Sequence, residues 1–364
     1  MKNNIKAEII AHSKRAGTGD EIITYKLTFP RIILSEVNTY KMLEKNTSSS
    51  RAIPFEKMVE VVEKEPFVPI AWMLEHKGMQ GDKYLTDPKH IEIKNKTWLR
   101  ARDKAVTSAK IIVGEVLDTI DEKILDIEIK HATGFVPNTS LSKNYGNRLL
   151  EPWMWVTQLC TGTRESFEHL FEQRCPIYNV ENLKFTSKKD AIGLFPHLKD
   201  MTDLEWLQCN SGQAEIHFMD LAEKMYDALN ESTPNILKED CWHIPFAKEI
   251  LNGKEFGFFA DMIKKSVCLT AKISYTKIGD ENSITSEKAQ EMYEKLKNSG
   301  HWSCFGHIAK CMTDDEYRSW IKGKIEREDY IVAIPKETHG YNKQLRGFIS
   351  LRQYVEDNVE LKDI

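Results

Sequence analysis

The chain is organised around residues 36–54, which read EVNTYKMLEKNTSSSRAIP. The pattern predicts a helix over residues 39–45, followed by a polar loop with three consecutive serines and an arginine, Ser48, Ser49, Ser50 and Arg51. Serine hydroxyls and free backbone N–H groups donate hydrogen bonds to phosphate oxygens, and an arginine binds phosphate through two parallel hydrogen bonds. Pro54 gives the loop a defined exit, because it favours an extended conformation at the residue before it. We therefore interpret residues 47–51 as a phosphate-binding cradle, with a serine-rich surface turn as the alternative.

Length and charge limit the classes of protein to which the chain can belong. Its 364 residues are enough for one large or two ordinary domains. The composition, 41% hydrophobic and 29% charged, is typical of a globular protein. A formal net charge of −4 and the lack of a basic tail argue against a nucleic-acid polymer as the main partner. A mononucleotide needs only a local basic pocket and is compatible with this charge.

The sequence contains no segment that predicts secretion or membrane insertion. Residues 1–17, MKNNIKAEIIAHSKRAG, lack an apolar core of signal-peptide length. No apolar run approaches the roughly 18 residues of a membrane span. The seven cysteines are scattered and odd in number, as expected of free thiols in a reducing compartment. We therefore predict a cytoplasmic protein without a membrane partner.

Hydrophobic periodicity and turn residues predict most of the secondary structure. Residues 5–12 and 22–34 alternate apolar and polar side chains, which predicts two strands around a turn at residues 16–20. We expect helices near residues 55–64, 98–116, 166–174, 216–225, 285–299 and 345–352. We also expect a loop over residues 65–85, a buried helix over the apolar run 153–161 and a strand over 269–275. Residues 121–145 lack periodicity and are either a mobile excursion near an active site or plain surface.

The cradle and its flanks resemble the signature of the flavin-dependent thymidylate synthases. The family pattern, RHRxxSxNExSxRY, is an Arg-His-Arg triplet followed by a Ser-x-Arg. The positions match without a gap: Thr39, Tyr40 and Lys41 fall on the triplet, and Asn46, Ser49 and Arg51 fall on the Asn, the last Ser and the last Arg. The triplet itself is not kept in this chain, and in the family those residues hold the flavin.

Four further segments resemble family motifs, at residues 147–152, 166–174, 211–216 and 300–307. In the family the equivalent of the last segment precedes the triplet, whereas here it follows all the other motifs. The resemblance therefore implies a circular permutation, which proteins tolerate when their termini lie close together at the surface. It also implies a single catalytic unit over residues 1–364, with insertions at 65–145 and 176–210. Two other segments, 76–80 and 242–246, are similar to those of viral or phage-type members, for which the compartment is the host cytoplasm.

The resemblance carries expectations about fold, activity and partners. It implies an α/β (α+β) fold with a central mixed or antiparallel sheet, packed helices and a permuted chain order. It implies reductive methylation of dUMP at C5 by a thymidylate synthase, with FAD as cofactor and NADPH and methylenetetrahydrofolate as co-substrates. The expected partner is thus a pyrimidine deoxynucleotide, dUMP or dCMP, and the expected assembly is a homo-oligomer, a tetramer with sites at subunit interfaces.

The chemistry of the cradle and the resemblance together give the candidate site residues. Arg174, which would polarise the pyrimidine ring, and Ser49 are the catalytic candidates. The substrate-binding candidates are Glu36, Thr47, Ser48, Ser49, Ser50, Arg51, Arg148 and Arg174. The cofactor-binding candidates are Thr39, Tyr40, Lys41, Asn46, His169, His301, Ser303 and His307. The reasoning is chemical: adding carbon to C5 of a uracil requires electron density at C5, and a cation beside the ring stabilises the charge that develops there.

Two alternatives stay open from the sequence. The nucleotide-facing positions are better kept than the flavin-facing ones, which also fits a relative that modifies C5 differently, on dCMP or by hydroxymethyl transfer. It fits equally a non-catalytic nucleotide-binding protein that has lost its flavin. The spacing of His301, Cys304, His307 and Cys311 could suit zinc, but the two histidines match family residues that have no metal role, so we predict no metal site.

Overall fold

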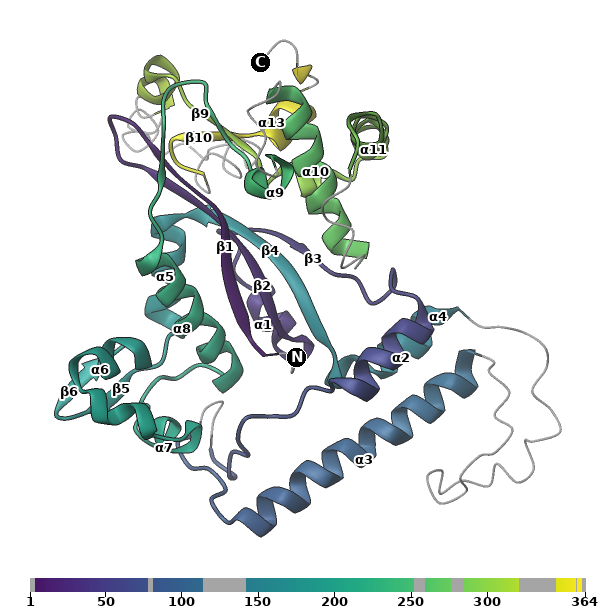
Figure 1. Ribbon diagram of the computed structural model, residues 1–364, viewed down its shortest axis with the longest axis vertical. Coiled ribbons are helices and arrows are strands. Elements are labelled where there is room, and N and C mark those ends of the chain that lie inside the picture. The colour runs from purple at the N-terminus through teal and green to yellow at the C-terminus, as the bar shows by residue number, and fades with distance from the viewer. Residues whose placement is uncertain are drawn as a thin grey trace, which may run out of the picture.

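A five-stranded mixed sheet forms the centre of the molecule, which is seen here as a computed structural model that describes residues 4–77, 81–113, 142–251, 259–275, 284–320, 345–357 and 359–361. Its strand order is β3-β4-β2-β1-β7, and every neighbouring pair is antiparallel except β1 and β7. The strands are β1 (Lys6–Arg15), β2 (Glu21–Pro30), β3 (Glu44–Thr47), β4 (Trp155–Thr163) and β7 (Asn235–Leu237). Together with the surrounding helices the sheet gives an α+β fold, as the sequence predicts (Figure 1).

The hairpin of β1 and β2 confirms the two predicted strands and their turn, except that β2 ends at Pro30 and the predicted strand residues 31–34 are helical. Lys6 pairs with Thr28 and Lys14 with Glu21, so the strands are in register along their length apart from one bulge. Two turn residues, Gly17 and Gly19, have φ of 87° and 81°, in the left-handed region where glycine is free of strain.

Helices cover one face of the sheet with the largest apolar core. Helix α5 (Arg164–Arg174) and helix α8 (Ile216–Glu231) pack on the side chains of alternate residues of β2, such as Tyr25 and Leu27. Figure 1 shows α5 and α8 together on the same side of the strands. Both helices are confirmed. The side chain of Glu215 caps α8 by accepting hydrogen bonds from two backbone N–H groups of its first turn.

Three predicted elements are wrong in type. Residues 39–45 are not a helix: α1 (Leu34–Asn38) ends before them, and β3 adds to the edge of β4. The run 153–161 is mostly the strand β4, which pairs with β2 on one side and β3 on the other. A strand that is buried on both faces has a continuous apolar sequence rather than an alternating one. Residues 269–275 are the end of helix α10 (Phe259–Tyr275) rather than a strand. Short apolar runs do not distinguish a buried strand from a buried helix, so pairing partners decided each case.

A helical layer lies at the end of the sheet where β4 begins. It consists of α2 (Phe55–Lys64), α3 (Pro88–Val113), α4 (Lys143–Leu149) and the 3-10 turn η3 (Glu151–Trp153). Phe55, Met58 and Val106 belong to its apolar core. The predicted helices 55–64 and 98–116 are confirmed as far as residue 113, and 65–85 is a loop apart from one bridge between Met73 and Tyr84. The unperiodic segment 121–145 lies mostly outside the described residues.

The last third of the chain packs against the other face of the sheet. Its helices are α9 (Ala247–Leu251), α10, α11 (Ser286–Asn298) and α13 (Leu351–Glu356), with the 3-10 turn η5 (Trp302–Phe305). A three-stranded sheet accompanies them, formed by β8 (Trp242–His243), β9 (Ala309–Cys311) and β10 (Phe348–Ser350). The predicted helix 285–299 is confirmed, whereas the helix expected over 345–352 begins only after β10.

Residues 176–210 form a small unit with its own core. It contains β5 (Tyr178–Val180), β6 (Leu183–Phe185), α6 (Lys188–Leu194), the 3-10 turn η4 (Pro196–Asp200) and α7 (Asp203–Gln208). The buried carboxylate of Glu223 on α8 anchors it by accepting hydrogen bonds from Tyr178 Oη at 2.8 Å and the backbone N–H of Lys188 at 2.6 Å. That the unit is an insertion stays a prediction. Among the described residues, no helix is long and apolar enough to span a membrane.

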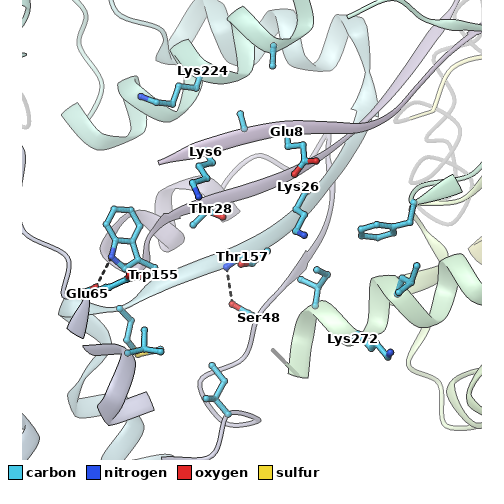
Figure 2. Close-up of a pocket in the computed structure, with 18 of the residues that line it drawn as sticks. Lys6, Glu8, Lys26, Thr28, Ser48, Glu65, Trp155, Thr157, Lys224 and Lys272 are labelled. Atoms are coloured by element: carbon cyan, nitrogen blue, oxygen red, sulfur yellow. Dashed lines mark hydrogen bonds between the residues drawn. The ribbon is translucent and has the colours of Figure 1, made fainter. Parts of the chain in front are cut away.

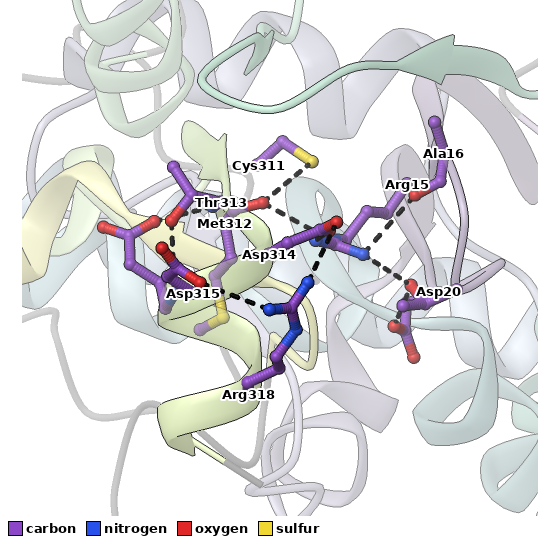
Figure 3. Close-up of polar contacts among 11 residues, drawn as sticks. Arg15, Ala16, Asp20, Cys311, Met312, Thr313, Asp314, Asp315 and Arg318 are labelled. Carbon is purple, nitrogen blue, oxygen red and sulfur yellow. Dashed lines mark hydrogen bonds and ion pairs between the residues drawn. The ribbon is translucent and has the colours of Figure 1, made fainter.

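A buried arginine joins the tip of the hairpin to the last third of the chain (Figure 3). Arg15 is 2% exposed and lies 2.5 Å from Asp314 Oδ1, while its Nε donates to Met312 O at 3.2 Å. Its guanidinium also stands 4.7 Å from the ring centroid of Tyr317. The side chain of Arg15 thus connects two segments that lie about 300 positions apart in the sequence.

We expect Arg15→Ala to lower the free energy of unfolding by about 2 kcal/mol, because it leaves the buried carbonyl of Met312 with only the weak thiol donor of Cys311 and removes the packing of a long side chain. The loss stays moderate because Asp314 is half-exposed and can be hydrated. Urea denaturation followed by circular dichroism measures the change. The control Arg318→Ala, on a side chain 73% exposed, should change the value by less than about 0.5 kcal/mol. Equal losses in both variants would contradict a role for the buried position.

Candidate functional site

The cradle is held by hydrogen bonds to three neighbouring elements, β4, α10 and η3. Ser48 continues the pairing with β4, since its backbone N–H donates to Thr157 O at 2.8 Å and its hydroxyl accepts from the Thr157 N–H at 3.1 Å. The next N–H, of Ser49, donates to Ser274 O of α10 at 3.1 Å. Ser50 Oγ donates to the carboxylate of Glu151 at 3.0 Å. The three consecutive serines are therefore hydrogen-bonded to three different elements, and these bonds fix the conformation of the loop.

Helix α4 is locked against the cradle from the opposite side. The fully buried Asn147 donates from Nδ2 to Ser50 O at 2.6 Å and to Ile53 O at 3.0 Å. A Cβ atom on Gly146 would lie 2.6 Å from Val113 and 2.8 Å from Phe55, so only glycine allows this approach. One face of α4 is consequently fixed on the loop.

A cavity of about 590 Å³ opens between the cradle, the start of α4, the end of α10 and the segment before β9. We call it the cradle cavity. Its lining includes predicted residues from both ends of the chain: Asn46, Ser49, Arg51, His301 and Ser303. The structure therefore brings together residues that lie about 250 positions apart in the sequence.

The cradle cavity is polar and positively charged. Arg51 and Lys143 supply two cations, and Ser49, Ser142, Ser274 and Ser303 line the space, while none of its described lining residues carries a carboxylate. The single thiol in that lining, Cys304, is buried, which raises its pKa to about 12 and keeps it neutral. The cavity thus offers cations and hydroxyl donors for an anion, and no thiolate nucleophile near neutral pH.

A larger cavity of about 890 Å³ lies on the other side of the cradle (Figure 2). Its floor is the exposed part of the sheet, and Ile53, Met58, Trp155 and Phe246 are among its apolar walls. Its charged residues have both signs: Lys6, Lys26, Lys57, Lys224 and Lys272 against Glu8, Glu65, Asp227 and Glu231. Ser48 lines this cavity whereas Ser49 lines the cradle cavity, so the loop separates the two. The mixed charge makes the larger cavity the poorer match for a phosphate.

Arg174 and Glu36 meet in a separate cluster with Tyr40. The guanidinium carbon of Arg174 lies 5.5 Å from the ring centroids of Tyr40 and Phe218, and its Nε is buried without a hydrogen-bond partner among the described residues. Burial raises the pKa of Glu36, the neighbouring carboxylate of Glu215 raises it further, and Arg174 opposes both. None of these residues lines the cradle cavity. The predicted catalytic arginine is therefore separated in this chain from the predicted phosphate site.

The other predicted residues have diverse environments. Arg148 is exposed on α4 and does not line the cradle cavity, and Thr47 accepts a hydrogen bond from Gln158 at 2.7 Å. Thr39 and Lys41 are exposed in the turn between α1 and β3, and the exposed His169 lies 3.0 Å from Gln173 Nε2. The structure thus brings five of the predicted site residues together in the cradle cavity, and the other predicted site residues lie outside it.

Several residues expected to hold a flavin are buried and hydrogen-bonded within the chain. Tyr40 donates to Gln173 at 2.9 Å and is 8% exposed. Both amide atoms of Asn46 are used, by Thr270 O at 2.7 Å and Ser274 Oγ at 3.0 Å. His307 is fully buried, with Nδ1 2.7 Å from Thr161 Oγ1 and Nε2 without a hydrogen-bond partner among the described residues. These three residues do not fit the flavin contacts that the resemblance implies, whereas His301 and Ser303 face the cavity.

The His307 contact is the end of a buried chain of hydroxyls and imidazoles across the sheet. Thr161 bonds to Thr24 at 2.7 Å, Thr24 to His243 Nε2 at 2.9 Å, and His243 Nδ1 to Ser13 at 2.9 Å. Burial lowers the pKa of both His243 and His307 to about 3, so both rings are neutral. Within the described part of the chain, the spacing that could suit zinc does not gather a group of three metal-binding side chains.

Sequence reasoning missed Ser142, Lys143 and Ser274 as residues of the site. Lys143 lies in the segment expected to be unperiodic, and Ser274 lies in the segment expected to be a strand. The sequence contained one usable signal, because Ser142 precedes a short helix and its hydroxyl caps that helix by accepting from the N–H of Asn144 at 3.3 Å.

Comparisons with known proteins give only distant similarities. No protein-family model matches the chain, and no curated protein matches its sequence. Two solved structures of the UMP/dUMP methylase PolB from Streptomyces cacaoi are similar. The complex with 5-Br dUMP has 9% identity and a TM-score of 0.39, covering 63% of this chain and 92% of that chain. The complex with 5-Br UMP has 11% identity and a TM-score of 0.38, covering 63% and 90%. At these values the similarity carries no functional argument for this chain.

Proposed function

We propose that this protein binds a pyrimidine deoxynucleotide in the cradle cavity and modifies its base at C5. One observation carries the proposal: Asn46, Ser49 and Arg51 share a cavity with His301 and Ser303, although the sequence separates the two groups widely. The cations and hydroxyls of this lining match a phosphate monoester, which is a dianion near neutral pH. The finer proposal, reductive methylation of dUMP with FAD, NADPH and methylenetetrahydrofolate, rests on the sequence resemblance.

The lining suggests an orientation for the nucleotide. The phosphate would lie beside Arg51 and Ser49, where the cations are. The sugar and base would extend toward Leu296 and Ser303, where the lining has fewer charges. This is positioning, which contributes to rate by holding the reacting ring in one place.

The residues present limit the chemistry that the cavity can perform. A neutral Cys304 does not add to C6 of the pyrimidine, so the electron density at C5 has to come from another source. Tyr40, Asn46 and His307 do not fit the implied flavin contacts, so the residues of this chain do not support a step through a flavin. In the proposal Arg174, which lies apart from the cavity, reaches a base through assembly of copies, as the expected homotetramer with sites at subunit interfaces implies.

A non-catalytic nucleotide-binding protein is the second candidate function. It is favoured by the same three residues, which are expected to hold a flavin but are buried and hydrogen-bonded within the chain. Both candidates share the nucleotide site and differ in cofactor and turnover.

Two measurements on the purified protein test the proposal. Calorimetric titration with dUMP and with dCMP is expected to show binding of at least one of them, and absence of binding to both would overturn the proposed function. The visible absorption spectrum, before and after FAD is added and the protein is desalted, shows whether flavin is retained. Retained flavin with NADPH oxidation that depends on dUMP supports the methylating enzyme. Nucleotide binding without flavin or product supports the second candidate.

A further inference from the structure

Helix α4 presents a lysine, rather than its arginine, to the cradle cavity. Lys143 lines the cavity with Arg51, and its Nζ donates to Ala52 O at 3.3 Å, which places the ammonium at the end of the cradle. Arg148 on the same helix is exposed and does not line the cavity. From this difference we propose that Lys143 is the second cation of the phosphate site, the role that the resemblance gives to Arg148. The inference rests on the proposed function, whose nucleotide would supply the phosphate.

The geometry of a short helix explains why the two cations differ. Residues three and four positions apart lie on the same face of a helix, so Lys143 shares a face with Gly146 and Asn147. That face is fixed on the loop, because Asn147 bonds to Ser50 O and Ile53 O and the close approach at Gly146 leaves no room to rotate. Arg148 lies about 140° around the axis from Lys143 at about 100° per residue. Turning α4 to bring Arg148 inward would break both Asn147 bonds.

The chemistry of the two cations is complementary. An ammonium has three N–H donors, and among the described residues Lys143 donates one hydrogen bond, to Ala52 O. The remaining donors suit the oxygens of a phosphate, which a lysine binds as a point charge, while Arg51 supplies a planar fork. No described lining residue carries a carboxylate that would neutralise the pair. A phosphate monoester is therefore the class of ligand that matches this end of the cavity.

The test compares Lys143→Gln, Arg148→Gln and a matched control, Lys94→Gln, an exposed lysine on α3. Calorimetric titration with dUMP, deoxyuridine and inorganic phosphate gives the dissociation constants. We expect Lys143→Gln to weaken dUMP and phosphate binding about tenfold and to leave deoxyuridine binding unchanged, because the nucleoside lacks the phosphate. Glutamine keeps an N–H donor for Ala52 O, so α4 should stay in place, and circular dichroism confirms folding.

Three outcomes would overturn the inference. One is a larger loss of dUMP and phosphate binding in Arg148→Gln than in Lys143→Gln. Another is a loss of deoxyuridine binding in Lys143→Gln equal to its loss of dUMP binding, which would indicate a structural role for Lys143. The third is wild-type protein that binds none of the probes. Wild-type protein that binds phosphate but neither dUMP nor dCMP would overturn the proposed function alone, and the phosphate titrations would still decide the role of Lys143.

Discussion

Lowering the pH from 7 to 5 is expected to remove about 4 kcal/mol from the free energy of unfolding of this protein, through two buried histidines. The pKa of His243 and of His307 falls from 6.5 to about 3 on folding, because burial disfavours the charged ring. The unfolded chain therefore binds more protons than the folded chain between these values. The free energy of unfolding has its full value above pH 6.5 and decreases as the pH falls toward 3. Each of the two neutral rings contributes about half of the decrease that is reached at pH 5.

The groups around His243 also favour a lowered pKa. His243 is bonded to Thr24 and Ser13, and the neighbouring positive charge of a protonated His12 or His307 would lower its pKa further. The pKa of His12 is itself lowered by burial, with Glu21 opposing the effect. Glu21 has a pKa of about 2, so its own contribution is lost only below its unfolded value of 4.5 and does not account for a change between pH 7 and 5.

Urea denaturation at pH 7, 6 and 5 measures this dependence. The variant His307→Gln cannot titrate at this position and is expected to lose about half of the pH dependence, whatever its stability at pH 7. The control His90→Gln, on an exposed ring of α3, should keep the wild-type dependence. If the pH dependence of His307→Gln equals that of the wild type, then His307 is not a buried neutral ring and does not contribute to the pH dependence of stability.

Replacing Arg51 with glutamine is expected to weaken dUMP binding about a hundredfold, or about 2.7 kcal/mol. The guanidinium is the one group in the cradle cavity that can form two parallel charge-assisted hydrogen bonds to a phosphate among the described lining residues. Arg51→Lys keeps the charge and loses the fork, and we expect a smaller loss of about tenfold.

The backbone conformation of the cradle should be unchanged in both Arg51 variants. Ser48 and Ser49 are anchored by backbone hydrogen bonds to Thr157 O and Ser274 O, and neither bond uses the arginine side chain. Thermal denaturation is therefore expected to be unchanged within error. Arg100→Gln, an exposed arginine on α3, is the matched control and should bind dUMP like the wild type. Equal affinities in Arg51→Gln and Arg100→Gln would remove the cradle from the proposed site.

Local patterns in the sequence were sufficient for elements that depend on their own residues. The hairpin of β1 and β2 needs alternation and two turn glycines, and helix α2 needs a periodic apolar face, so both were predictable. Strand β4 and helix α10 were misassigned because their apolar runs fit either structure. The type of β4 depends on pairing with β2 and β3, and that of α10 depends on packing against α11 and against strand β3 at Asn46.

The sequence by itself determined the α+β class, and it predicted that the three serines and Arg51 form an anion-binding loop. Only the tertiary structure decided which residues share a cavity with that loop. It placed His301, Ser303 and Lys143 in the same cavity lining as Arg51, left Arg148 outside that lining, and kept Arg174 in a cluster with Tyr40. The physical reason is that residue type and spacing describe what a side chain can bind, whereas the direction in which it points depends on how its helix or strand is anchored. For α4 that anchor is Asn147, whose two hydrogen bonds to the loop no local pattern predicts.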